Sequence, residues 1–462
     1  MREWKTRVAG IRAGLQNSLF QDPPPPRGGV GRSRSVAIFA ALFALAVLLQ
    51  MLRVGWSASV HTLWAEDGAV YLSGALHSDL GGSLFDTYAT YLVFVPRVIG
   101  EIADLLPLQD APVAISVLSG GVVALSGFVV WQATAGLIES PALRAALAAA
   151  TVLVPVGGLE SAASAAYVPW YMLFASFWVL LWRPQSAWGA GCAGLFVLAT
   201  GLSTPGLWFF VPLALLRTLA ARDRRDTLIL GGFWLGALVQ VPVLAFNEEK
   251  AVTPLWTHDI WTDFLQRVLD GAALGLQLGG KAWVHFGWAF LIALIALALV
   301  ALAYGVSRAG LAARLLALVA IPTSLVMFVV SVYQRAVGPQ MAWPANIYFD
   351  AAGRYAIVPA LLLVSVVLVT IDRRSRRHES EASPAWLAYG VAAAMLVVIA
   401  TSFDVHDSDI RGGTTWRTAL RHGAEACAAE DATETGVETS PPGWSLNIPC
   451  DRLAPFAPGT ER

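Results

Sequence analysis

The sequence predicts an all-α fold: a polytopic transmembrane helix bundle of about eleven spans, with an interfacial helix in the first extracytoplasmic loop and a small extracytoplasmic C-terminal tail. Of the 462 residues, 56% are hydrophobic and only 14% are charged, and the mean hydropathy is +0.60. This composition is far more apolar than that of an average soluble domain. Apolar runs of bilayer length recur along the chain, and many of the 18 Trp residues lie at their ends, the level that Trp favours in membranes.

Residues 1–34 form a basic arm that we expect on the cytoplasmic side. Its Pro and Gly cluster at residues 23–31 cannot sustain a helix. The arm is similar to the start of a signal peptide, but the apolar run behind it is too long and lacks a small-residue cleavage site. We therefore expect an uncleaved membrane anchor.

Residues 35–403 form the expected transmembrane domain. About 20 apolar residues cross a bilayer, and fewer suffice where neighbouring helices shelter a span. The expected spans are Val36–Arg53, Pro112–Leu137, Ala142–Val156, Tyr167–Trp182, Ala187–Leu202, Gly206–Ala220, Thr227–Phe246, Ala282–Tyr304, Leu311–Tyr333, Tyr355–Ile371 and Ala385–Ser402.

Charges between the spans predict the orientation. With the N-terminus inside, the inner connections collect the basic clusters Arg222–Arg225 and Arg373–Arg377, as the positive-inside rule requires. The opposite connections are acidic and include Glu66, Asp67 and most of the tail after Phe403. We therefore expect a multi-pass plasma-membrane protein with a cytoplasmic N-terminus and an extracytoplasmic C-terminus. The Ala-, Gly- and Arg-rich composition favours a bacterial source.

The first outer loop, residues 55–111, contains the expected interfacial helix in its second half, Tyr88–Leu106. Arg97, Glu101 and Asp104 are spaced by four and three residues, which places all three on one helical face. An apolar helix with one charged face suits the membrane surface better than a span.

Residues 404–462 form the expected extracytoplasmic tail, in which Thr415–Cys427 has the pattern of an amphipathic helix. Cys427 and Cys450 both lie in this tail. Because an outer compartment permits disulfides, a bridge between them is a hypothesis, and two free thiols are the alternative. Cys192 lies in an apolar run and is interpreted as a small buried hydrophobic residue.

Motifs of soluble enzymes such as GxxxxGK[ST], GxSxG, HExxH and CxxC are absent from the sequence. Chemistry must then come from residues near the outer membrane surface, and Glu66-Asp67-Gly68 is the best candidate. Adjacent carboxylates point in different directions, so one can accept a proton while the other orients a partner or helps hold a divalent cation. The competing interpretation is that the pair simply begins a helix, because acidic residues favour a first helical turn.

Basic residues on the same side are candidates to bind a phosphate or diphosphate. Arg97 in VPRV and Arg354 in GRYAIVP can each form bidentate hydrogen bonds with such a group, although Arg97 can instead snorkel outward or pair with Glu101. Lys281 and His285 lie one helical turn apart at the start of a span. Interfacial anchoring explains this pair as well as ligand contact does.

The order of these features resembles the GT-C superfamily of integral-membrane glycosyltransferases. WAEDG follows the first span, the long outer loop contains YLVFVPR, and GRYAIVP enters a late span. The resemblance implies a polyprenyl-phosphate-linked sugar donor. It also implies Asp67 and Glu66 as catalytic acids, one acting as base, and Arg354 and Tyr355 near the lipid phosphate. The chain departs from better-defined members in lacking a large soluble outer domain, so a glycan, lipid or protein acceptor is left open.

In this interpretation, a polyprenyl tail lies among the helices and membrane lipids, and Arg97, Arg354 and Lys281 offset the charge of the departing phosphate. Asp67 removes the proton of the acceptor hydroxyl in one displacement that inverts the anomeric centre. Use of a divalent cation, Mg or Mn, is left open, with Glu66 and Asp67 as its ligands.

Two rival functions compete with transfer. A transporter or flippase for lipid-linked glycans would favour ionisable groups deep within the spans, and the apolar runs are nearly free of charge. A non-catalytic membrane scaffold predicts that neither carboxylate matters. None of these interpretations involves nucleic acid.

Overall fold

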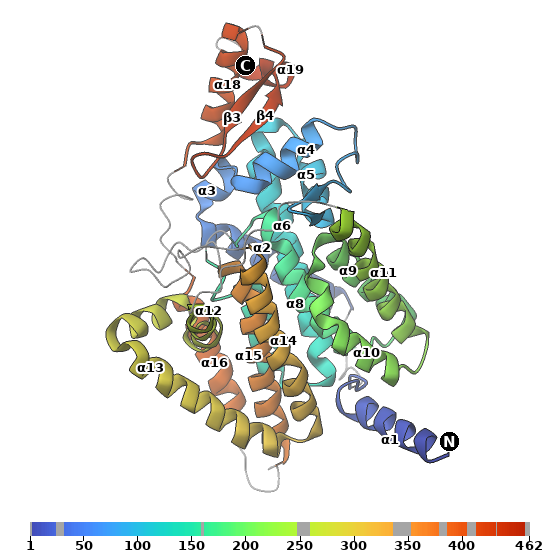
Figure 1. Cartoon of the computed structure of the whole chain (residues 1–462). Helices are drawn as coiled ribbons and strands as arrows, with labels where there is room; N and C mark the ends of the chain where they lie inside the picture. Colours follow the sequence, from blue (N-terminus) through green and yellow to red (C-terminus); the bar gives the residue numbers. More distant parts are fainter. Residues whose placement is uncertain are drawn as a thin grey trace.

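The computed structural model describes residues 2–24, 32–158, 161–246, 259–335, 353–377, 386–403, 413–430 and 432–457. Its long helices stand together as one bundle below a smaller projection (Figure 1). The bundle contains α2 (Arg32–Val54), α6 (Ala111–Ala133), α7 (Pro141–Val152), α8 (Val168–Leu181), α9 (Ala187–Ser203), α10 (Val211–Ala220), α11 (Arg224–Phe246), α13 (Gly271–Ala309), α14 (Leu311–Arg335), α15 (Gly353–Arg377) and α16 (Trp386–Thr401). The projection contains α3 (Trp56–His61), α4 (Ser73–Leu76), α5 (Phe94–Asp104), α18 (Trp416–Glu430), β3 (Glu434–Glu438), β4 (Ser445–Pro449) and α19 (Cys450–Leu453).

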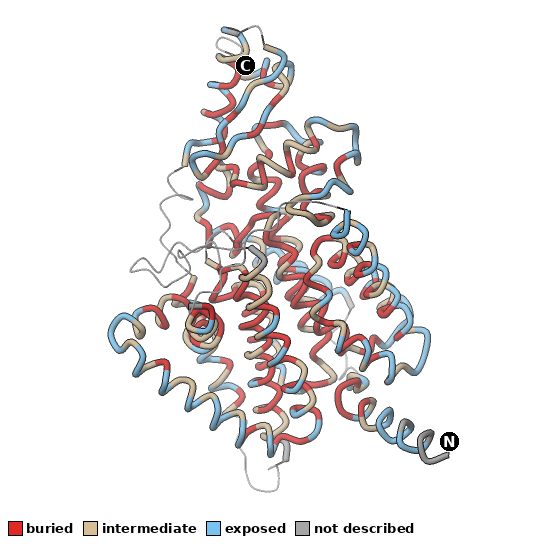
Figure 2. The backbone as a smooth tube through the Cα atoms, viewed as in Figure 1, coloured by how far each residue is buried: buried red, intermediate tan, exposed pale blue. Residues whose placement is uncertain are grey.

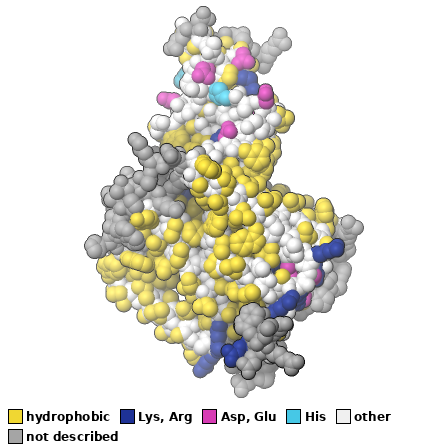
Figure 3. Space-filling model, turned by 45° about the vertical axis from the view of Figure 1, so that its right-hand side comes forward, with side chains coloured by type: hydrophobic (Ala, Val, Ile, Leu, Met, Phe, Trp, Pro, Cys, Tyr) yellow, Lys and Arg dark blue, Asp and Glu magenta, His cyan; other side chains and the backbone are white. Residues whose placement is uncertain are grey.

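Each segment expected to cross the membrane contains a helix. Among the described residues, six helical segments are long and apolar enough to cross a bilayer, and five further apolar helices are only 10–17 residues long. On the face drawn in Figure 3, hydrophobic side chains cover the bundle, Lys and Arg gather near its lower end, and Asp, Glu and His are prominent on the projection. The chain is therefore a multi-pass helical membrane protein, and its span count and orientation stay predictions.

The core of the bundle lies around α8. All of its residues except Trp170 are buried, so this helix is apolar on every side and has protein around it, as expected of a central helix (Figure 2). Phe174, Phe177 and Trp178 are its large core side chains. Helix α15, which carries Arg354, packs against α8 and α14 and so places its first turn beside the centre of the molecule.

Helices α9 and α11 make the closest helix pair, and glycine is the reason. A Cβ added at Gly201 would lie 2.7 Å from the Cα of Gly236, and one at Gly232 would collide with the Gly194 carbonyl oxygen. Small residues at such crossings let two backbones approach each other inside a membrane. Cys192 on α9 is exposed, so its interpretation as a buried residue was wrong.

Two helical segments were not expected from the sequence. Helix α1 (Arg2–Ser18) lies in the N-terminal arm and ends before the proline cluster. Helix α12 (Asp259–Asp263), the π-helical segment Phe264–Asp270 and the start of α13 occupy a stretch that was assigned to a loop. Three ionisable side chains of this stretch, Asp263, Arg267 and Asp270, lowered its hydropathy although all three are buried.

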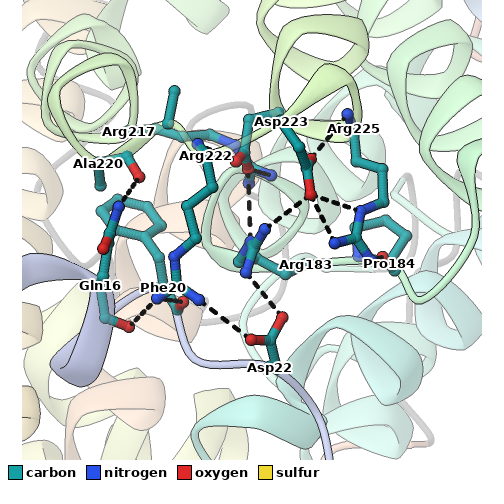
Figure 4. Close-up of polar contacts among 12 residues, drawn as sticks. Gln16, Phe20, Asp22, Arg183, Pro184, Arg217, Ala220, Arg222, Asp223 and Arg225 are labelled. Atoms are coloured by element: carbon teal, nitrogen blue, oxygen red, sulfur yellow. Dashed lines mark hydrogen bonds and ion pairs between the residues drawn. The ribbon is translucent and has the colours of Figure 1, made fainter.

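A polar cluster fixes the N-terminal arm to the lower end of the bundle (Figure 4). Arg183 donates to Asp22 over 2.8 Å and to Asp223 over 3.2 Å, and Arg222 reaches Asp22 over 3.1 Å. Beside it, the buried Arg217 pairs with Asp226 over 2.9 Å. The basic residues of this end are therefore partly neutralised by acidic neighbours, and the arm lies at the end opposite the C-terminal projection.

The first loop differs in detail from its expected form. Ala89 and Thr90 have φ of 52° and 76° and form the turn between the short strands β1 (Thr87–Tyr88) and β2 (Tyr91–Leu92), so the helix begins only at Phe94. The charged face of α5 turns toward the protein: Glu101 accepts hydrogen bonds from Gly81 and Ser83.

The C-terminal tail forms a small unit, here called the appendage (residues 413–430 and 432–457). It contains the expected amphipathic helix as α18, together with an antiparallel pairing of β3 and β4 that the sequence did not predict. A disulfide joins Cys427 of α18 to Cys450 of α19, with the two Cα atoms 5.8 Å apart. The appendage packs against α4 and the π-helical segment Asp67–Leu72, and its Arg452 reaches Asp104 of α5 (Figure 1).

Candidate active site

The acidic motif lies at a sharp turn between α3 and a π-helical segment, Asp67–Leu72. Ala65 has a φ of 28°, a backbone conformation that side chains other than glycine rarely adopt. The turn sends the two neighbouring carboxylates into different surroundings: Glu66 is half-buried and Asp67 is buried. Strained residues and π-helical turns are both frequent at functional sites.

Asp67 is held from one side by the segment that leads into α8. Its Oδ1 accepts hydrogen bonds from the Ser164 hydroxyl and from the Ala166 N–H, both over 3.1 Å. Burial raises the pKa of Asp67 to about 7, although these hydrogen bonds lower it, and the neighbouring charge of Glu66 adds to the rise. A carboxyl group of this kind exchanges its proton near neutral pH.

Glu66 faces a different space, a cavity of about 420 Å³ between the projection and the bundle. The cavity wall combines one acid and one arginine with many aromatic rings. Its polar charged members are Glu66 and Arg354, and its aromatic members are Tyr71, Tyr88, Tyr91, Trp170, Trp208, Phe209 and Tyr355. Leu244 of α11 and Val330 of α14 extend the wall into the apolar part of the bundle.

Arg354 is oriented by the aromatic residues around it. Its Nη1 donates to the Tyr167 hydroxyl over 3.0 Å, and its guanidinium carbon lies 5.5 Å from the Tyr167 ring centre and 5.3 Å from that of Tyr355. Such cation–π contacts hold a guanidinium in place. Arg354 and Tyr355 come from the first turn of α15, where the chain enters the bundle.

A short segment connects the acid motif with the arginine. Residues 164–167 bond Asp67 through Ser164 and Ala166 and receive Arg354 on Tyr167. The structure thus brings together Glu66, Asp67, Arg354 and Tyr355, which the sequence could relate only by their order.

Arg97 lies behind this wall. It is buried, its Nη1 donates to the Val70 carbonyl oxygen over 2.6 Å, and its guanidinium lies 5.7 Å from the ring centre of Tyr71. Because Tyr71 lines the cavity, Arg97 supports the wall instead of lining it. Snorkelling does not describe this buried geometry. The charges of Arg97 and Glu101 do interact, while the hydrogen bonds that Glu101 accepts come from Gly81 and Ser83.

Lys281 and His285 lie elsewhere. Both are exposed within α13, and His285 Nδ1 contacts the Lys281 carbonyl oxygen over 3.0 Å. Neither belongs to the cavity wall as the described residues form it. The pair lies between two kinks of α13, at Gly275 with φ of 73° and at Gly287 with φ of 52°.

The acid pair does not form a ligand set for a metal ion. Glu66 lines the large cavity, whereas Asp67 lines a separate small one beside Ser116 and Ser164. Within the described ranges, no three His, Cys, Asp or Glu side chains come together as metal ligands.

Ser164 and the cavity tyrosines other than Tyr355 were not predicted from the sequence. Tyr71, Tyr88 and Tyr91 lie in the loop that carries the acid motif, and Tyr167 lies at the first residue of an expected span. A cluster of Tyr on one side of the predicted membrane is the only signal that pointed to them, and it does not say which rings meet.

Comparison with known proteins returns little. No protein-family model matches the chain, and neither does any curated protein. Among solved structures, the crystal structure of the Archaeoglobus fulgidus oligosaccharyltransferase in complex with Zn and sulfate is similar, with 13% sequence identity and a TM-score of 0.36. The similarity covers 83% of this chain and 55% of that one, so this chain spans about half the length of the archaeal protein.

Proposed function

We propose that the chain is a membrane glycosyltransferase of the GT-C type, which transfers a sugar from a polyprenyl-phosphate donor to an acceptor hydroxyl on the extracytoplasmic side. One observation carries the proposal: Glu66 and Arg354 line one aromatic cavity where the projection meets the bundle. A sugar joined to a lipid phosphate needs a cation for the phosphate, flat apolar surfaces for the sugar, and a carboxylate for the incoming hydroxyl.

Each part of the wall has a role in this proposal. Arg354 binds the donor phosphate and offsets its charge as it leaves, while the apolar side near Leu244 and Val330 accommodates the start of the lipid tail. Tyr355 and the other rings enclose the sugar. Asp67 is a positioning residue, because it holds the segment whose Tyr167 orients Arg354.

The reaction is a single displacement. The acceptor oxygen forms a bond to the anomeric carbon on the face opposite the phosphate, and the bond from that carbon to the phosphate oxygen breaks. Polyprenyl phosphate leaves with the electron pair, and Glu66 takes the hydroxyl proton, so the anomeric centre is inverted. This assigns the role of base to Glu66, in place of Asp67 as the sequence suggested, because Glu66 is the acid that lines the large cavity.

Separate Glu66→Gln and Asp67→Asn variants test the proposal. Purified protein in lipid nanodiscs is assayed for sugar transfer from a short-chain polyprenyl-phosphate donor. Loss of the general base should lower kcat of Glu66→Gln by about 10²- to 10⁴-fold. Asp67→Asn should lose less, since an amide oxygen can still accept from Ser164 and Ala166. Full transfer by both folded variants would refute the assignment of this pair.

One observation favours the alternative, a transporter or flippase for lipid-linked glycans. Asp263, Arg267 and Asp270 are buried within a candidate span, and neither carboxylate oxygen of Asp270 has a hydrogen-bond partner among the described residues. Ionisable groups at such positions are typical of transport pathways. Translocation of a fluorescent lipid-linked glycan across proteoliposomes, abolished by Asp270→Asn but kept by Glu66→Gln, would support transport over transfer.

A further inference from the structure

The appendage does more than cover the helices of the first loop, because its chain pairs directly with the acid motif. The Ala65 N–H donates to the Ser440 carbonyl oxygen over 2.5 Å, and the Ser440 N–H donates to the Leu63 carbonyl oxygen over 2.9 Å. These two bonds form an isolated parallel bridge at Trp64. We propose that the appendage is a positioning element for Glu66 and Asp67, an inference that rests on the proposed function.

The bridge acts at the strained point of the turn. Ala65 has a φ of 28°, and a non-glycine residue keeps such a conformation only when its surroundings hold it there. Ser440 bonds the chain at Leu63 and at Ala65, on both sides of Trp64. It therefore fixes the residue that immediately precedes Glu66.

A second contact lies on the other side of the acid pair. A Cβ added at Gly68 would lie 2.9 Å from Cγ2 of Thr439 and 2.8 Å from Cδ2 of Leu63. A side chain at residue 68 would clash with Thr439 of the appendage and with Leu63, so glycine fits this position. The appendage touches the motif both before Glu66 and after Asp67.

Two polar contacts hold the appendage against α5 and the turn that follows it. Arg452 Nη2 pairs with Asp104 of α5 over 2.7 Å, and the buried Trp416 donates its indole N–H to the Leu108 carbonyl oxygen over 2.7 Å. The disulfide joins α18, which carries Trp416, to α19, which carries Arg452. The two contacts are therefore covalently linked to each other through the disulfide.

Loss of the Arg452 or Trp416 contact should lower the rate of catalysis more than it weakens donor binding. Without the bridge, Ala65 can return to an ordinary φ and turn Glu66 away from the cavity, whereas Asp67 stays bonded to Ser164 and Ala166. Arg354 and Tyr355 belong to α15 of the bundle, so the donor phosphate site stays in place. The expected kinetic result is a lower kcat with an unchanged KM for the donor.

The test uses the full chain in nanodiscs with Arg452→Met and, as a second variant, Trp416→Phe, which removes the indole donor and one ring of the buried side chain. The matched control is Arg421→Met, at an exposed arginine of α18. Hydrogen exchange of residues 61–74 should become at least about tenfold faster in both variants. Transfer should show kcat reduced by about tenfold or more and donor KM within about twofold of wild type. Arg452→Lys should restore part of both.

The inference would be overturned if hydrogen exchange became faster in residues 432–450 while exchange in residues 61–74 and kcat stayed unchanged. The appendage would then not position the acid motif. The exchange result does not depend on activity. If wild-type protein transfers no sugar while the exchange coupling is present, the proposed function fails and the mechanical link between the appendage and the acid motif stands.

Discussion

The burial of Asp67 makes a quantitative prediction about stability and pH. In the folded protein its pKa is raised from 3.8 to about 7 because burial penalises the charged form. The folded state therefore binds a proton more tightly than the unfolded state. The contribution of this group is fully present below pH 3.8, is lost as pH rises toward 7, and is absent above that.

The magnitude follows from the two pKa values. The difference between 3.8 and about 7, at about 1.4 kcal/mol per pKa unit, is an upper limit of about 4 kcal/mol. Asp67→Asn removes the ionisation and keeps an oxygen that can accept from Ser164 and Ala166. The variant should therefore gain stability over wild type as pH rises, by about 2 to 3 kcal/mol between pH 5 and pH 8.

Reversible unfolding in mixed micelles, followed by tryptophan fluorescence at pH 5, 6, 7 and 8, measures this gain. The quantity to compare is the difference in free energy of unfolding between Asp67→Asn and wild type at each pH. The burial of an ionisable Asp67 would be refuted if this free-energy difference stayed constant over the pH range. It would also be refuted if the variant were less stable than wild type at pH 8.

Three further perturbations follow from the same contacts. Glu101→Gln should show the opposite pH dependence. Burial raises the pKa of Glu101, but the hydrogen bonds from Gly81 and Ser83 have the larger effect, so the pKa is lowered overall. The ionised Glu101 therefore stabilises the fold above about pH 4.5, and this stabilisation is lost as the pH falls. Its deficit in unfolding free energy at pH 7, about 1.5 to 3 kcal/mol, should shrink in acid, and a deficit that grows in acid would contradict this. Arg354→Met should raise the donor KM by about 10- to 100-fold with the fold intact, measured in the transfer assay, and an unchanged KM would remove this residue from the donor site. Arg217→Met removes the nearer arginine of the buried Asp226, leaving Arg183 at 3.8 Å, and should cost about 3 kcal/mol of unfolding free energy. The control Arg225→Met removes a half-exposed pair and should cost about 1 kcal/mol or less, so equal losses would contradict the argument.

Hydropathy located the helices because the bilayer imposes a local rule. Every expected span contains a helix, from α2 to α16, and the amphipathic pattern in the tail correctly predicted α18. The same rule failed where charge interrupts a buried helix, as at Asp263, Arg267 and Asp270. Hydropathy also did not predict the hairpin turn at Ala89 and Thr90. The residues with positive φ there are not glycines, so the sequence carries no turn signal at this point.

The candidate site divides in the same way. The sequence by itself determined which residues carry charge beside the apolar runs: Glu66, Asp67, Arg97 and Arg354 were all found by that position. Only the tertiary structure decided that Glu66 and Arg354 share a cavity, that Arg97 lies behind its wall, and that Ser440 of the tail holds the turn at Ala65. Hydrophobic pattern is a property of neighbouring residues, whereas a cavity and a backbone bridge depend on how distant helices pack.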